Sequence, residues 1–153
     1  MIAERLRSGG GLATALTEDQ LAVIVDLAEE RAFTQGEYLF RQDTRAGEFF
    51  VIEHGRASIE LAPPARPPIV LQTLSRGDLV GLSWWFPGSV WKWDARAVTD
   101  VATFAFDADA VRAACARDIV LRQAFAEFIA SEFAVRLHRA RLQLLDMYGA
   151  PES

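Results

Sequence analysis

The middle of the chain is a succession of short apolar segments separated by turns that contain glycine. Segments this short are typical of strands, and the glycines supply tight turns between antiparallel neighbours. The pattern predicts an antiparallel barrel, sandwich or roll. We therefore expect an α+β fold that is mainly β, with an antiparallel β-roll or jelly roll over about 33–106. The segments read YLF (38–40), FFVI (49–52), ASIEL (57–61), IVLQTL (69–74), ARAV (95–98) and VATFAF (101–106).

Ahead of the roll, the sequence predicts an N-terminal arm and one helix. The arm covers 1–16 and is expected to be helical or loose, and its run of three glycines favours a flexible break. Thr17 and Gln20 have the S/T-x-x-E/Q form of a capping box, and apolar residues follow at helical spacing. We expect this first helix to run from about Glu18 to about Glu30.

Behind the roll, the sequence predicts a short and a long C-terminal helix over about 108–148. Asp107 can cap the short helix, and Asp118 can cap the long one, which Gly149 and Pro151 would end. The apolar residues of the long helix cover more than one stripe. One stripe can pack on the roll, and an identical helix across a two-fold axis is the simplest partner for the other. We therefore expect a homodimer through the long helix.

Composition narrows the function classes. A length of 153 residues suits a single domain, 1–153. Two histidines and one cysteine leave too few ligands for a His/Cys zinc site. The sequence contains no G-x-S-x-G nucleophile elbow, phosphate-binding P-loop or dinucleotide fingerprint. We therefore expect neither an enzyme nor a metal site.

Charge and hydropathy bear on partners and location. The 16 basic residues against 21 acidic ones give a net charge of −5, which argues against a nucleic-acid-binding surface. No apolar run reaches the roughly 18–20 residues that a membrane span needs, and the start lacks the apolar core of a secretory signal. A single cysteine suits a reducing compartment. We expect a cytoplasmic protein that binds neither nucleic acid nor membrane.

Three motifs in the roll carry a resemblance to a known family. F-T-Q-G-E-Y-L-F-R-Q (33–42), F-F-V-I-E-H-G-R-A (49–57) and L-S-R-G-D-L-V-G (74–81) follow one another in order. They resemble the opening strand pair, the hairpin and the lead-in to the phosphate-binding cassette of the cyclic-nucleotide-binding domain family. The resemblance extends over about 12–148. It implies a β-roll, a short helix and a long helix, with a ligand held at the cassette.

The same resemblance implies a sensor or regulatory role. In the cyclic AMP receptor protein, whose sensor domain this chain resembles, a DNA-reading helix-turn-helix follows the long helix. Here the chain stops at Ser153, so we expect a stand-alone domain without a DNA-binding domain. The segment G-L-S-W-W-F-P-G-S-V-W-K-W-D-A-R-A (81–97) is similar to that of a bacterial group of short, stand-alone domains. The family mechanism would have the ligand reorient the long helix.

The cassette departs from the family pattern, F-G-E-x-A-L followed by R-x-A. In the family, the glutamate accepts a hydrogen bond from the ribose and the arginine pairs with the phosphate. Gly81 keeps the turn, but Leu82 stands at the glutamate position and Trp91 near the arginine position, with Lys92 beside it. Contacts to charged groups contribute about 1.5–3 kcal/mol each. Losing both weakens binding roughly 10²- to 10⁴-fold, so we do not expect cyclic AMP bound in the usual way.

Tryptophans replace the lost polar groups, and two interpretations stay open. All four lie within 84–93. In one interpretation they line a modified site for a nucleotide or another small anionic or aromatic ligand, with no other cofactor indicated. In the other, they fill the pocket or dock a protein partner, which makes the domain a ligand-free interaction module. The candidate ligand-binding residues are Gly81, Leu82, Ser83, Trp84, Trp91, Lys92, Trp93 and Arg96.

Overall fold

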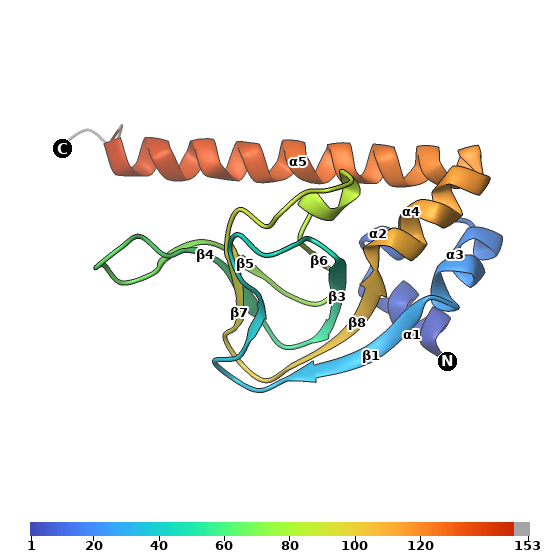
Figure 1. Ribbon diagram of the computed structural model, residues 1–153, viewed down its shortest axis with the longest axis horizontal. Coiled ribbons are helices and arrows are strands. Elements are labelled where there is room, and N and C mark those ends of the chain that lie inside the picture. The colour runs from blue at the N-terminus through green and yellow to red at the C-terminus, as the bar shows by residue number, and fades with distance from the viewer. Residues whose placement is uncertain (149–153) are drawn as a thin grey trace.

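Two four-stranded antiparallel sheets form the body of the molecule (Figure 1). The computed structural model describes residues 1–148. One sheet has the strand order β1-β8-β3-β6, and the other has the order β2-β7-β4-β5. Strands distant in sequence are therefore neighbours in space, as in a roll. The strands are β1 (Ala28–Phe33), β2 (Tyr38–Phe40), β3 (Glu48–His54), β4 (Ala57–Leu61), β5 (Ile69–Leu74), β6 (Leu79–Val80), β7 (Asp94–Ala97) and β8 (Val101–Asp107).

Helices gather at one end of the roll and along one side of it. In Figure 1 the N-terminal helices and α4 lie together near the N-terminus, while α5 runs along the whole molecule. The expected fold class, a mainly β-roll with an N-terminal helix and a short and a long C-terminal helix, is confirmed. The helices are α1 (Ile2–Gly9), α2 (Leu12–Ala15), α3 (Glu18–Val25), the 3-10 helix η1 (Ser83–Trp85), α4 (Ala108–Arg117) and α5 (Ile119–Tyr148).

The first helix is shorter than expected, and the roll begins earlier. Helix α3 ends at Val25, whereas the sequence predicted a helix to about Glu30. The segment beyond it is strand β1, which pairs antiparallel with β8 from Ala28↔Phe106 to Phe33↔Val101. A full ladder of tertiary hydrogen bonds overrides a local helical pattern. The roll therefore starts at residue 28 and not at about 33.

The predicted caps are in place. Thr17 accepts a hydrogen bond from the backbone N–H of Gln20, whose side chain accepts one from Thr17 in return. Asp107 accepts from the N–H of Ala110 at the start of α4. Asp118 accepts from two backbone N–H groups at the start of α5. These bonds satisfy donors that the first turn of a helix leaves without partners. The predicted helix end at Gly149 and Pro151 lies outside the described residues.

The first 16 residues take the helical alternative of the expected arm: they fold into α1 and α2 and pack on the roll. Leu6, Leu12 and Leu16 are buried. Gly9 at the end of α1 and Gly11 just before α2 lie against the turn before β6, where Gly77 has φ +87°. A Cβ on Gly77 would clash with the carbonyl oxygen of Gly9. The absence of side chains at this crossing lets two backbones touch.

Helix α5 changes its surroundings along its length. Leu121, Phe125 and Ile129 in its first half are buried against the core. From Leu137 to Asp146 every residue is exposed. The second half of α5 is therefore an exposed helix that carries apolar side chains.

Among the described residues, no helix has the combination of length and apolarity required to cross a bilayer.

We predict that Gly77→Ala destabilises the protein more than Gly36→Ala. Both glycines have positive φ, which costs a side chain about 1–2 kcal/mol. Around Gly36 nothing lies within 4 Å of the new Cβ, whereas at Gly77 the Cβ meets the backbone of Gly9. Overpacking adds about 1–3 kcal/mol. Urea unfolding of the two variants measures the difference, and equal losses of stability would contradict the backbone crossing.

Candidate functional site

The cassette starts at Gly81, which has a positive φ of +93° and no side chain, so an indole ring can lie on its backbone. A Cβ at Gly81 would lie 2.5 Å from Cη2 of Trp91. The Trp91 ring stacks on Phe40, with ring centroids 3.8 Å apart and planes 8° apart. Trp91 is 2% exposed. The ring therefore belongs to the core, between the cassette turn and β2.

Trp84 holds the other side of the cassette. It is fully buried, and its Nε1 donates a hydrogen bond of 3.1 Å to the carbonyl oxygen of Gly81. Its ring stacks on Phe49 of β3, with centroids 3.8 Å apart. The neighbouring Trp85 lies parallel to Phe125 of α5, with centroids 5.9 Å apart. Stacked aromatic pairs of this kind join the cassette to both the sheet and the long helix.

Two arginines add polar contacts between the cassette and the C-terminal helices. Arg112 of α4 donates from Nη1 to the carbonyl oxygen of Trp84. Arg136 of α5 donates from Nη2 to the carbonyl oxygen of Leu79, at 2.6 Å. Burial lowers the pKa of the Arg136 guanidinium, against the opposing effect of Glu132. The backbone on either side of Gly81 is therefore tied to α4 and α5.

The remaining residues of the predicted cassette set are dispersed. Leu82 is buried, and Ser83 is half-buried at the start of η1. Lys92 and Trp93 are exposed, the latter by 42%. The structure thus divides the candidate ligand-binding residues between the core and the surface. Arg96 lies apart from both groups, on strand β7.

Arg96 lies on the opposite face of its sheet from the core. In the antiparallel register of β4 and β7, Ser58 pairs with Arg96. The core face holds Ala57, Ile59 and Ala95, all buried. Because successive strand residues alternate between faces, Arg96 shares its face with Ser58 and not with this apolar set. Its side chain therefore points away from the interior of the roll.

Arg96 there forms an ion pair with Glu60 of β4. Its Nε and Nη2 donate to Oε2 of Glu60, at 3.2 and 3.0 Å. The Glu60 side chain is 2% exposed, and the hydroxyl of Ser58 donates to the same oxygen. Sequence reasoning missed Glu60. The signal that could have found it is an acidic residue inside the otherwise buried strand ASIEL, two positions from Ser58.

A second carboxylate on this face is also engaged. Asp94, which is opposite Glu60 in the register, accepts a hydrogen bond of 2.7 Å from the backbone N–H of Gln42. Its Oδ1 also lies 3.4 Å from Nε of Arg41. The guanidinium of Arg41 stacks over the ring of Tyr38 at 3.9 Å. Two acidic and two basic side chains therefore balance one another on the outer face of the sheet.

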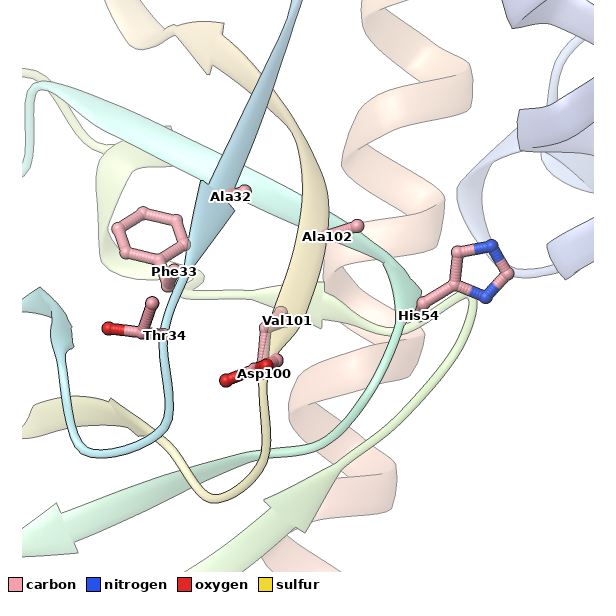
Figure 2. Close-up of a pocket in the computed structure, with 7 residues that line it drawn as sticks. All are labelled: Ala32, Phe33, Thr34, His54, Asp100, Val101 and Ala102. Carbon is pink, nitrogen blue, oxygen red and sulfur yellow. The ribbon is translucent and has the colours of Figure 1, made fainter.

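A separate cavity of about 330 Å³ opens where β1 ends and β8 begins (Figure 2). Its walls include Phe33, Thr34 and Val101. Figure 2 shows the His54 ring pointing away from Phe33 and Asp100. Asp100 accepts a hydrogen bond of 2.9 Å from the backbone N–H of Gln35. These positions do not assemble an acid–base pair inside the cavity.

The single cysteine is buried in the core and does not form part of a reactive site. Burial raises the pKa of the Cys115 thiol to about 11, so the thiol is protonated at neutral pH and packs as a small apolar group. Within the part of the chain that the structure describes, no three His, Cys, Asp or Glu side chains come together in a group suited to a metal ion. Among the described residues, the candidate binding groups are therefore those of the cassette and of the outer face of the sheet.

Comparison with known proteins places this geometry in a family. Residues 30–118, more than half of the chain, match the family model of the cyclic nucleotide-binding domain. Over 68 residues, 43% of this chain, the sequence is 40% identical to isozyme 1 of the cGMP-dependent protein kinase of Drosophila melanogaster. The chain spans only 9% of that kinase.

Two solved structures show the same fold. A putative cyclic nucleotide-binding protein of Geobacter metallireducens is 22% identical, with a TM-score of 0.79 over 90% of this chain and 99% of that one. The catabolite activator protein of Thermus thermophilus is 21% identical, with a TM-score of 0.71 over 87% of this chain and 61% of that one. From its matched family model and its β-roll with a long final helix, the chain belongs to the cyclic nucleotide-binding domain family.

Proposed function

We propose that this chain is a regulatory domain, not an enzyme, whose cassette is closed by its own aromatic side chains and does not bind cyclic AMP in the usual way. The observation that carries the proposal is the contact of Trp91 with Gly81. The indole stacks on Phe40 and is 2% exposed, so a ligand would have to displace a core side chain. Removing an aromatic ring from a core costs about 3–5 kcal/mol.

The polar groups that hold a cyclic nucleotide in the family pattern have no substitutes at this turn. Leu82 is buried and cannot accept a hydrogen bond from a ribose hydroxyl. Lys92, the cation beside Trp91, is exposed, and Arg96 is engaged with Glu60 on the outer face. A cyclic phosphate brought to Gly81 would therefore lose its hydration without gaining a paired charge.

One observation favours the other candidate function, a modified ligand site. Trp93 and Lys92 are adjacent and exposed, and an exposed indole beside an ammonium group can hold a small anionic or aromatic molecule. A nucleotide could stack there without entering the core. The family mechanism, in which a ligand reorients the long helix, would then start from the surface of the cassette.

The proposal is tested by adding cyclic AMP and cyclic GMP in a thermal-shift assay. We expect no rise in melting temperature, whereas a ligand at 100 times its dissociation constant would add about 2.7 kcal/mol of stability. We expect a rise for Leu82→Glu combined with Trp91→Arg, because the pair removes the ring from Gly81 and supplies both missing groups. The matched control is Leu82→Glu with Trp93→Arg, which leaves Trp91 in place. Micromolar binding by the unmodified protein would overturn the closed cassette.

The same proposal includes a homodimer through α5. The dimer is proposed to be cytoplasmic and to bind neither nucleic acid nor membrane. Phe133, Leu137, Ala140 and Leu144 recur at spacings of four, three and four residues, the spacing of a coiled-coil seam. Phe86 of the cassette loop extends this stripe, with its ring centroid 6.4 Å from that of Phe133. A second copy supplies the same stripe, so an identical helix is the partner that matches the spacing.

We predict that sedimentation velocity at micromolar concentration finds a dimer. Leu137→Glu with Leu144→Glu should produce a monomer with an unchanged circular dichroism spectrum, since both positions are exposed within one chain. His138→Glu with Gln143→Glu adds the same carboxylates away from the stripe and should remain dimeric. A monomer in the unmodified protein would contradict the homodimer and leave a different protein as the partner of α5.

A further inference from the structure

A second cavity lies on the outer face of the sheet β2-β7-β4-β5, away from the interior of the roll. It has a volume of about 460 Å³, in the range of small-molecule sites. Strands β4, β5 and β7 form its floor, and the turn that contains Gly36 forms part of its rim. It is lined by Gln35, Gly36, Ser58, Glu60, Val70, Thr73, Arg96, Ala97 and Val98.

The carboxylate of Glu60 has one occupied and one unoccupied oxygen. Oε2 accepts hydrogen bonds from Arg96 and Ser58. Oε1 is buried and has no hydrogen-bond partner among the residues that the structure describes. Buried polar atoms almost always have partners, because leaving one without a partner is unfavourable. Glu60 lines the cavity, so a donor on a bound molecule that reached this carboxylate would give Oε1 the partner that the described residues do not supply.

The guanidinium of Arg96 has one nitrogen that does not bond to Glu60. Both of its bonds to Glu60 come from Nε and Nη2, so Nη1 takes no part in this ion pair. The side chain is 37% exposed, which leaves it within reach of a molecule in the cavity. An acceptor and a donor of opposite charge thus stand side by side. Because the pair is neutral overall, it favours a molecule that carries both charges over a simple anion or cation.

We propose that this cavity binds a small zwitterion, an α-amino acid with an aliphatic side chain. The ammonium group would donate to Oε1 of Glu60, and the carboxylate would accept from Nη1 of Arg96. Val70 and Val98 offer apolar surface for the side chain, and the Thr73 hydroxyl lies on the polar part of the wall. This site is independent of the cassette, since β4 and β7 turn their opposite face to the core.

The probe is L-leucine, measured by isothermal titration calorimetry. The two comparison molecules are 4-methylpentanoate, which lacks the ammonium group, and 3-methylbutylamine, which lacks the carboxylate. We expect L-leucine to bind and each comparison molecule to bind at least about tenfold more weakly. Equal binding of either comparison molecule would overturn the zwitterion. No heat of binding from L-leucine, L-valine or L-isoleucine up to about 10 mM, which covers millimolar affinity, would overturn the site.

Variants separate this cavity from the rest of the surface. Glu60→Gln removes the charge that faces the ammonium group and should weaken L-leucine binding at least about tenfold. Val98→Trp fills the rim while leaving both Glu60 and Arg96 in place, so it should abolish binding even where Glu60→Gln fails to fold. The matched control, Glu29→Gln on the exposed edge of β1, should bind like the unmodified protein. Unchanged binding by folded Val98→Trp would overturn the location.

Discussion

The rest of the structure depends on the contact between the Trp91 indole and the backbone of Gly81. An indole can lie there only because residue 81 has no side chain, as a Cβ would approach the ring to 2.5 Å. With the ring in place, Phe40 gains a stacking partner and the loop from η1 to β7 is held against the roll. The same glycine offers its carbonyl oxygen to Trp84. Both buried tryptophans therefore converge on one residue, and the cassette turn becomes part of the core.

Strand alternation explains why the cassette and the outer cavity are separate. Residues two apart on β4 share a face, so Ser58 and Glu60 lie together while Ile59 faces the core. Arg96 enters the outer face because it is opposite Ser58. Five positions along the chain separate it from Trp91, yet the two side chains serve opposite sides of one sheet. Nearness in sequence is therefore a poor guide to the composition of a site on strands.

Most of the fold could be predicted from the sequence, whereas the ligand-binding role of the cassette residues stays a prediction. Glycine turns and apolar segments mark strands directly, and the caps at Thr17, Asp107 and Asp118 mark helix starts. The end of α3 could not be predicted, because pairing with β8 is a tertiary effect. Likewise, a motif could identify Gly81, Leu82 and Trp91 as family positions. It could not show that Arg96 belongs with Glu60, because that partnership arises from register between two strands.

The proposed closed cassette would change where a ligand could act on α5. A ligand shifts a conformational equilibrium only by its difference in affinity for the two states. With the Trp91 ring against Gly81, the stacking of Trp85 on Phe125 and the hydrogen bond from Arg136 to Leu79 are both formed. A nucleotide at Gly81 would have to break this arrangement before it could favour another. Arg96 lies within β7, which begins at Asp94, three residues after Trp91. A molecule on the outer face would contact this strand without entering the core, so the core contacts of Trp91 would stay in place.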